Sequence, residues 1–547
     1  MSLKDDLHKF FKGEILEDDQ TLTLFSKDAS LYSIRPQAVL YPHGVEDIKG
    51  LIKFINDHPE QKLSITPRSA GTDMSGGAIN DSLILEMTQY FNKIKHVGEG
   101  SATVEPGVFY RDFEKETLKH DLLLPCYTAS REINTVGGMV ANNSAGEKTL
   151  FYGQTKDYVE ELKVVLADGN EYQVGPITKK ELDKKMAQKN FEGRLYKSVF
   201  DLVDKNYEQI QSARPKTHKN ATGYLLWEIW NRETGIFDLS KALVGSQGTL
   251  GIVTEIKFKL VKPQTHSRML VIFMKNLDNL STIVNAVLRY KPESFESYDD
   301  YTMKFAMKFL PEIIKVFGPK NIFSLGFQFI PEMWMTVTGG LPKLVLLAEF
   351  TGETDEEALQ KAVAAKQSVA GFKLNNRITQ NPEDARKYWV VRRESFNLLR
   401  KHSPHRRTAP FIDDIIVKPE VLPEFLPKLR KLMAEYELIY TMAGHIGDGN
   451  FHIIPLMDLT DPRSREVIKE LGTRVYDLVF QYGGSMSAEH NDGLVRGPYL
   501  ETMYGKEVFA MFKELKTIFD PKNILNPHKK ADATFEYSME HISKDSS

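Results

Sequence analysis

Three short segments in the first half of the chain consist almost entirely of glycine and small polar residues. They cover residues 67–78, 134–146 and 245–251. Glycine has no Cβ, so its backbone N–H can approach a phosphate closely, and a series of such groups forms an anion-binding nest. Ordering such a segment costs conformational entropy unless something packs against its backbone. Three of them in one region therefore predict an extended ligand, such as a dinucleotide.

The first of these segments does not follow either familiar nucleotide-binding pattern. Its sequence is Pro67-Arg68-Ser69-Ala70-Gly71-Thr72-Asp73-Met74-Ser75-Gly76-Gly77-Ala78. This is neither G-x-G-x-x-G nor G-x-x-x-x-G-K-[ST], so the Rossmann and P-loop mechanisms do not apply as written. Taken alone it is more typical of a generic turn. The prediction of a ligand therefore depends on all three segments together.

Charge and cysteine content exclude several classes of partner and of redox centre. The chain has 547 residues, with 71 Lys+Arg against 74 Asp+Glu, a formal charge of −3, so nothing draws it as a whole to nucleic acid. The single cysteine, Cys126, can form neither an intrachain disulfide nor a cluster site of four thiolates. Redox chemistry would thus need an organic cofactor, or a metal held by imidazoles and carboxylates. Without a signal-like start or a long apolar run, we expect a cytoplasmic location, and peripheral contact with the cytoplasmic face of a membrane stays open.

A metal site is predicted in the second half. Two strand-like runs, 439–442 and 451–454, surround a Gly-Asp-Gly-Asn turn, so His445 and His452 would flank the mouth of one hairpin. An adjacent pair, Glu489-His490, follows in another glycine-rich loop. Two imidazoles and one carboxylate suit Zn²⁺ or a similar ion and leave coordination positions free for substrate. A single histidine is more often structural, but these four residues together favour a metal centre.

These motifs resemble a known pair of domains. Residues 67–78 and 134–146 are similar to the FAD-binding domain of the vanillyl-alcohol oxidase/p-cresol methylhydroxylase (PCMH) superfamily. Residues 444–452, 487–490 and 519–527 resemble the FAD-linked oxidase C-terminal domain of the group that contains glycolate oxidase, D-lactate dehydrogenase and D-2-hydroxyglutarate dehydrogenase.

The resemblance implies an α+β fold. A PCMH-type FAD-binding domain of two subdomains would be followed by an α+β substrate (cap) domain with an antiparallel sheet, and a C-terminal segment would return to the flavin. We expect an N-terminal helical segment over 1–35, the FAD-binding domain over 36–262, the cap domain over 263–480 and the C-terminal segment with the catalytic loop over 481–547.

The resemblance also implies the site residues. Non-covalent FAD would contact Pro67, Arg68, Gly71, Thr72, Asp73, Met74, Gly76, Gly77, Gly137, Gly138, Asn142, Ala145, Gly146, Gly251, Ile252, Val253 and Asn526. A divalent metal, zinc or manganese, would be bound by His445, His452 and Glu489, beside the catalytic base His490. In the W-x-x-R stretch, Arg392 would clamp the substrate carboxylate, with Arg393 as the competing choice. Asp73 stands where Ser or Gly is usual, and an acid beside a pyrophosphate is costly unless it faces away.

The implied function is metal-assisted, FAD-dependent oxidation of a D-2-hydroxy acid, similar to D-lactate, by hydride transfer to flavin N5. The electrons would pass to a quinone, a cytochrome or an electron-transfer flavoprotein, and a homodimer stays open. Ile412 occupies a position that often carries a Lys for a second carboxylate, which argues against hydroxyglutarate. The alternatives are a non-redox transferase of the alkyl-dihydroxyacetone-phosphate synthase type, a catalytically silent protein that only carries flavin, and a His/His/Glu metallohydrolase on an unrelated glycine-rich scaffold.

Overall fold

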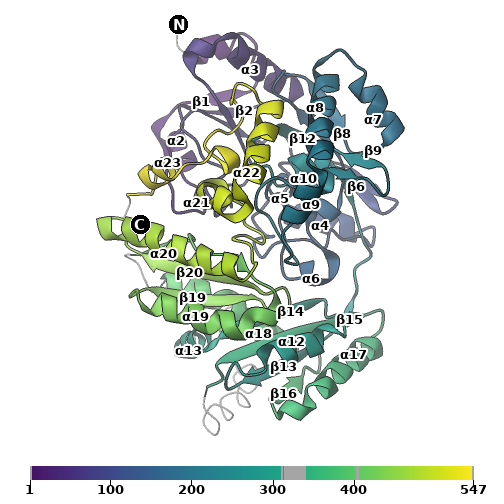
Figure 1. The fold of residues 1–547 in the computed structure, drawn as a ribbon, viewed down its shortest axis with the longest axis vertical. Coiled ribbons are helices and arrows are strands. Elements are labelled where there is room, and N and C mark those ends of the chain that lie inside the picture. Colours follow the sequence, from purple (N-terminus) through teal and green to yellow (C-terminus); the bar gives the residue numbers. More distant parts are fainter. Residues whose placement is uncertain (1–2, 310–311, 313–340, 402–405, 545–547) are drawn as a thin grey trace.

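Two smaller sheets and a short three-stranded ribbon from the first half of the chain stand beside one large sheet from the second half (Figure 1). The computed structural model describes residues 3–309, 312, 341–401 and 406–544. The described segments mix helices with parallel and antiparallel strands, as an α+β fold requires.

The first sheet has the strand order β1-β2-β4-β3. Its strands are β1 (Glu14–Leu16), β2 (Ala38–Tyr41), β4 (Leu83–Glu86) and β3 (Ile65–Arg68). β2, β4 and β3 are parallel, and the crossover from β2 contains α3 (Val45–Asp57). The expectation of a helical segment over 1–35 is partly wrong: α1 (Leu3–Leu7) and α2 (Asp19–Phe25) are separated by β1, which pairs antiparallel with β2. Ile15, only 3% exposed, makes β1 part of this core, so long-range burial outweighs the local helical preference.

The second sheet has the order β5-β6-β12-β7-β8 and is antiparallel throughout. Its strands are β5 (Ile94–Gly98), β6 (Ser101–Val104), β12 (Ile252–Lys259), β7 (Val159–Val165) and β8 (Glu171–Val174). A hairpin at Asp168-Gly169 joins β7 to β8, with Gly169 at φ 73°. A short ribbon of β10 (Trp230–Asn231), β11 (Ile236–Asp238) and β9 (Pro176–Thr178) lies further along this part of the chain.

Helices accompany these two sheets, several of them within the charged stretch 180–235. They are α4 (Tyr110–Leu118), α5 (Val136–Asn142), α6 (Thr149–Tyr152), α7 (Lys179–Met186), α8 (Phe191–Lys205), α9 (Tyr207–Ala213), α10 (Leu226–Ile229) and α11 (Ser240–Leu243). α5 and α6 bring the second glycine-rich segment toward the large sheet (Figure 1).

The large sheet has the order β16-β13-β15-β14-β19-β20-β17, and β18 also pairs with β20. The strands are β13 (His266–Met274), β14 (Ser294–Asp299), β15 (Leu344–Gly352), β16 (Asn375–Ile378), β17 (Arg407–Thr408), β18 (Ile415–Ile416), β19 (Ile439–His445) and β20 (Asn450–Met457). Its helices are α12 (Leu280–Leu288), α13 (Asp300–Lys308), α17 (Asp355–Ser368), α18 (Pro382–Lys401), α19 (Leu422–Ala434) and α20 (Pro462–Gln481). All described pairings in this sheet are antiparallel, as expected for the cap domain.

The end of the chain returns to the first sheet (Figure 1). It contains α21 (Gly493–Arg496), α22 (Leu500–Phe519) and α23 (Phe535–Glu540). Ile65 pairs with Leu525, and the N–H of Asn526 donates to the Ile65 carbonyl at 2.8 Å. The C-terminal segment therefore packs against β3, the strand that leads into the first glycine-rich segment.

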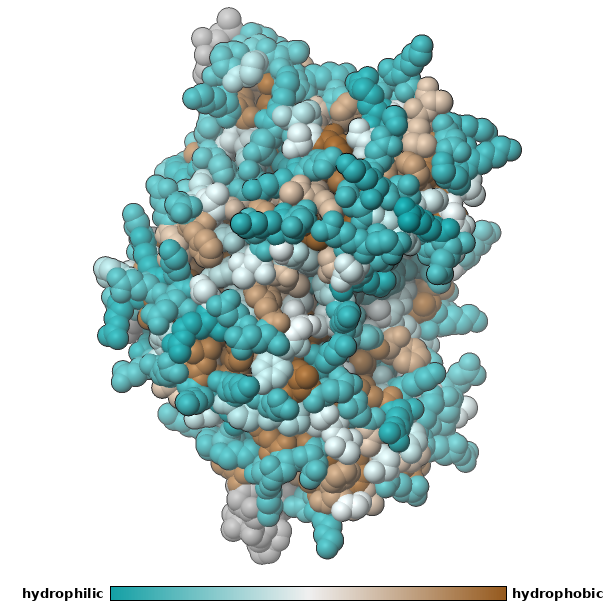
Figure 2. All heavy atoms as spheres, viewed as in Figure 1, coloured by the Kyte–Doolittle hydropathy of each residue, from teal (hydrophilic) through white to brown (hydrophobic). Residues whose placement is uncertain are grey.

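The visible face in Figure 2 is mostly hydrophilic, with apolar side chains scattered across it. Within the described ranges, no helix combines the length and apolar character needed to cross a membrane.

Candidate functional site

The β19–β20 hairpin brings two imidazoles together. His445 lies opposite Asn450 in the register, and His452 is two residues further along β20, so both side chains are on one face of the sheet. The two ring centroids are 5.2 Å apart. The turn needs Gly449, which has φ 74° and whose missing Cβ would lie 1.8 Å from the Val417 carbonyl oxygen. Local strand geometry is thus sufficient to place these two histidines side by side.

The loop between α20 and α21 carries Glu489 to the hairpin. Asp414 holds this loop, because its Oδ2 accepts hydrogen bonds from the Glu489 N–H at 2.8 Å and the His490 N–H at 2.7 Å. Glu489 Oε1 is then 3.1 Å from His445 Nε2, and Oε2 is 3.9 Å from His452 Nε2. Ligand atoms of these three side chains all lie within 4.8 Å of one another, the spacing that one metal ion requires.

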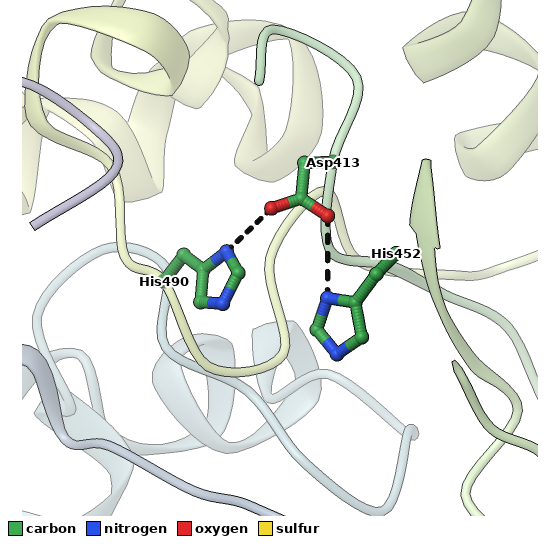
Figure 3. A group of neighbouring side chains, drawn as sticks. All are labelled: Asp413, His452 and His490. Atoms are coloured by element: carbon green, nitrogen blue, oxygen red, sulfur yellow. Dashed lines mark hydrogen bonds and ion pairs between the residues drawn. The ribbon is translucent and has the colours of Figure 1, made fainter. Parts of the chain in front are cut away.

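A carboxylate lies against the outer nitrogen of each imidazole. Nδ1 of His445 is 2.6 Å from Glu296 Oε1. Asp413 serves two rings: its Oδ1 is 3.2 Å from His452 Nδ1 and its Oδ2 is 2.7 Å from His490 Nδ1 (Figure 3). Histidines that bind metals usually engage a carboxylate or carbonyl through their other nitrogen, which fixes the tautomer. The inner Nε2 atoms are thereby left for a metal or a substrate.

The buried charged groups of the site carry a net negative formal charge. Its buried carboxylates are Glu296, Asp413, Asp414, Asp448 and Glu489, and its buried cations are Lys219, Arg392 and Arg496. With neutral imidazoles, five negative and three positive groups leave a formal charge of −2. One divalent ion would cancel this charge.

The imidazoles respond to the same excess of negative charge. Burial by itself lowers the pKa of His445, but Glu296 outweighs it and the pKa is raised to about 9. Burial likewise lowers the pKa of His490, and Asp414 and Asp413 raise it to about 9. In the metal-free site, protonation of His445 and His490 therefore adds two positive charges, as many as a bound divalent ion would add.

Lys219 connects the His445–His452–Glu489 cluster to the second glycine-rich segment. Its side chain is fully buried, and Nζ donates to Glu489 Oε1 at 2.7 Å and to the Gly146 carbonyl at 3.4 Å. Nζ also lies 3.0 Å from Asp448 Oδ2. Burial lowers the pKa of Lys219, but Asp448 and Glu489 more than compensate, so the ammonium stays charged.

The two candidate arginines have different partners. Arg393 Nη2 contacts both carboxylate oxygens of Glu147, at 2.7 and 2.6 Å. Arg392 pairs with Glu296, and its side chain is only 8% exposed. Its Nε is buried and has no hydrogen-bond partner among the described residues. Arg392 therefore retains a donor for a ligand carboxylate, whereas Nη2 of Arg393 is already paired with Glu147.

The three glycine-rich segments converge on one another. Asn142 Nδ2 donates to Asp73 Oδ1 at 3.1 Å, and Gln247 Nε2 donates to Ser75 Oγ at 2.9 Å. Asn526 Nδ2 donates to the Gly77 carbonyl of the first segment at 2.8 Å. The half-buried positions of this region include Pro67, Gly71, Thr72, Asp73, Met74, Gly137, Gly138 and Asn142; Arg68, Gly76, Gly77, Ala145, Gly146 and Asn526 are buried. The first two segments thus share one partly open surface, whereas residues 245–251 are buried behind it.

Asp73 faces its own loop. Its Oδ2 accepts from the Gly77 N–H at 2.5 Å and from the Ser75 N–H at 3.2 Å. The carboxylate therefore takes up two of the amides that a glycine-rich loop could offer to an anion, which leaves the earlier amides of the loop for a phosphate.

Gly138 leaves open space beside α5. It occupies a helical position, where glycine is about 0.5–1 kcal/mol less favourable than alanine. A Cβ at Gly138 would come within 4 Å of only one atom outside its chain neighbours and helix backbone, Thr135 Oγ1 at 3.3 Å. Nothing in the described chain requires glycine here, so the space fits a bound group such as FAD.

Two predicted cofactor contacts have a packing role in the structure. Ile252 is fully buried in the core, and the missing Cβ of Gly251 would lie 2.6 Å from Val164 Cγ2. Val253, the next residue of β12, is half-buried.

Sequence reasoning missed the carboxylates and the lysine behind the imidazoles. Asp448 belongs to the Gly-Asp-Gly-Asn turn, and the doublet Asp413-Asp414 directly precedes an apolar strand. These neighbouring residues could have identified the three carboxylates as candidates from the sequence. No neighbouring residue could have identified Glu296 or Lys219, because their partners are more than a hundred residues away in the chain.

Two family models match the chain. Residues 36–175 match an FAD binding domain, and residues 263–530 match the C-terminal domain of FAD linked oxidases. Among solved structures, 4-ethylphenol oxidase from Gulosibacter chungangensis has a TM-score of 0.66 at 15% identity, covering 96% of this chain and 95% of that one. p-Cresol methylhydroxylase has a TM-score of 0.64 at 17% identity, with 95% and 94% covered. These likenesses show the PCMH-type fold.

Curated relatives match along most of the chain. A D-2-hydroxyglutarate dehydrogenase of Pseudomonas putida is 27% identical over 95% of this chain. The chain spans only 50% of that relative, and likewise about half the length of the other relatives that match first. Glycolate oxidase subunit GlcD of Bacillus subtilis is 28% identical with 96% of both chains covered, and a D-lactate dehydrogenase of Archaeoglobus fulgidus is 26% identical with 90% of both covered. Fold and matches together show that the chain belongs to the FAD-linked oxidases in which a PCMH-type FAD-binding domain is joined to the FAD-linked oxidase C-terminal domain.

Proposed function

We propose that this chain is an FAD-dependent dehydrogenase that oxidises a D-2-hydroxy acid, similar to D-lactate, to the 2-oxo acid with the assistance of a metal. The observation that carries the proposal is the cluster of inward-facing imidazole nitrogens and Glu489, which Lys219 links to Gly146 in the expected flavin segment. The names of the relatives, D-2-hydroxyglutarate dehydrogenase, glycolate oxidase and D-lactate dehydrogenase, agree with this reaction class.

The three glycine-rich segments would hold FAD non-covalently through their backbones, with Gly138 leaving room over α5. The flavin supplies the hydride acceptor at N5, and the protein supplies position and electrostatics. His445, His452 and Glu489 would hold Zn²⁺ or Mn²⁺, which supplies Lewis acidity that makes a bound hydroxyl easier to deprotonate. The electrons would leave to a quinone, a cytochrome or an electron-transfer flavoprotein.

The protein's own residues orient the substrate and move its proton. The unpaired Nε–H of Arg392 binds the substrate carboxylate and so selects the face of C2 that is presented. His490 accepts the hydroxyl proton at Nε2, because its Nδ1 faces Asp413. A base must be neutral to accept a proton, and a divalent charge nearby favours the neutral imidazole, so the metal and the base are suited to each other.

The chain's own residues favour a substrate without a second carboxylate. Ile412, at the position where a lysine would pair with such a group, is fully buried in the apolar core. Lactate-like acids therefore suit this site better than hydroxyglutarate. Location in the cytoplasm, contact with a membrane face and formation of a homodimer stay predictions from the sequence.

Anaerobic titration with D- and L-2-hydroxy acids tests the proposal directly. We expect D-lactate to bleach the flavin absorbance of the purified protein, and the L-isomer to do so much less. The His490→Ala variant should remain yellow but lose bleaching by at least about 100-fold in rate, the usual contribution of a general base. If no hydroxy acid bleaches the flavin and chelators have no effect, the dehydrogenase proposal is rejected and the non-redox transferase becomes the better interpretation.

A further inference from the structure

Asp413 is a fully buried carboxylate that contacts two imidazoles of different expected roles. It lies just before β18, and Arg496 Nη2 donates to its backbone carbonyl at 2.6 Å. Its side chain reaches His452 with one oxygen, at 3.2 Å, and His490 with the other, at 2.7 Å (Figure 3). The two rings are nearly parallel, with centroids 5.1 Å apart.

An acceptor at Nδ1 keeps the ring proton on that nitrogen and leaves the lone pair on Nε2. Both rings meet Asp413 through Nδ1, His452 by a hydrogen bond and His490 by an ion-pair contact, so one carboxylate favours the same tautomer in both. We propose that Asp413 is the positioning residue that presents His452 Nε2 to the metal and His490 Nε2 to the substrate proton. This inference rests on the proposed function.

Aspartate suits this role for a simple chemical reason. Its ionised carboxylate has two accepting oxygens and no donor, so it can receive a hydrogen bond from each ring. Asparagine has nearly the same shape but only one accepting oxygen, and its other terminus is a donor. In Asp413→Asn, one imidazole would therefore face an N–H₂ group and adopt the opposite tautomer.

A second metal between Asp413, His452 and His490 is the competing explanation. The ligand atoms of these three residues also lie within 4.8 Å of one another. The formal charge of −2 on the surrounding buried groups suits one divalent ion, and the His445–His452–Glu489 set already accounts for it. The charge therefore favours Asp413 as a support for the rings.

The test compares Asp413→Asn with Asp299→Asn in the full chain loaded with FAD. Asp299 is a matched control, because it is a buried aspartate at the end of β14 that accepts from the Thr302 N–H and contacts no imidazole in the described structure. Three quantities are measured: FAD content with thermal unfolding, Co²⁺ affinity by visible absorbance, and the rate of anaerobic flavin bleaching by D-lactate at saturating Co²⁺.

For Asp413→Asn we expect unchanged FAD content and unfolding, Co²⁺ affinity weaker by about 10–100-fold, and bleaching slower by at least about 100-fold. The bleaching rate should fall more than the apparent affinity for D-lactate. Asp299→Asn should retain both Co²⁺ affinity and bleaching. If Asp413→Asn keeps both properties at the level of the control, the inference is overturned. A Co²⁺ stoichiometry of two per wild-type chain would also overturn it, in favour of the second metal.

A measurement on the unmodified protein covers the case in which Asp413→Asn does not fold. ¹⁵N NMR of the Zn²⁺-loaded protein, labelled at histidine, should show His452 and His490 as neutral rings protonated at Nδ1. Rings protonated at Nε2 would contradict the inference. Absence of bleaching in wild type by every hydroxy acid would reject the proposed function, while the Co²⁺ and NMR results would still decide the role of Asp413.

Discussion

Replacing Gly138 with alanine should separate the stability of the chain from its affinity for FAD. Gly138 lies in α5, where its N–H donates to Thr135 Oγ1 at 3.2 Å, and a Cβ would meet only that oxygen, at 3.3 Å. Alanine is favoured over glycine inside a helix by about 0.5–1 kcal/mol. We therefore expect the FAD-free Gly138→Ala protein to be more stable than wild type by up to about this amount.

In the proposed complex, the same methyl group would meet bound FAD. Forcing one extra carbon into a close contact typically costs about 1–3 kcal/mol. At 1.4 kcal/mol per tenfold change, FAD affinity should fall by roughly 5–150-fold. Urea unfolding of the FAD-free protein measures the first effect, and flavin fluorescence during titration of that protein with FAD measures the second.

Gly137→Ala is the matched control on the neighbouring residue. A Cβ at Gly137 would lie 2.5 Å from the Pro106 carbonyl oxygen, so the protein itself excludes it. This variant should lose stability whether or not FAD is present. The reasoning is refuted if Gly138→Ala binds FAD as tightly as wild type, or if it destabilises the FAD-free protein as much as Gly137→Ala does.

Two further predictions concern the metal and the arginines. Burial lowers the pKa of His445 but Glu296 raises it to a net value of about 9, so a metal at Nε2 must displace a proton at lower pH. Co²⁺ affinity should accordingly fall by about tenfold per pH unit from pH 8 to pH 6, and an affinity that does not vary with pH would be evidence against metal binding at His445. Arg392→Gln should raise the KM for D-lactate by about 10-fold or more through loss of a charge-assisted hydrogen bond, whereas Arg393→Gln should change it much less. Equal effects of the two substitutions in steady-state assays would remove Arg392 as the carboxylate clamp.

The sequence by itself determined the features that depend on neighbouring residues. Gly449 and the strands on either side of it form a hairpin whose register alone brings His445 and His452 to one face. The glycine-rich segments likewise indicated a ligand, because their lack of side chains is a property of the sequence. Turn geometry and strand alternation are local, so reading the chain in order is enough to predict them.

Only the tertiary structure decided what lies behind these residues. Glu296 and Asp413 reach the imidazoles from other strands and loops, and Lys219 joins Glu489 from a segment 270 residues away in the chain. The same holds for β1, a strand inside a segment expected to be helical, and for Asp73, which turns toward its own loop. In each case the outcome depends on burial and on pairing between distant segments, and the free energy of those contacts cannot be read from local sequence.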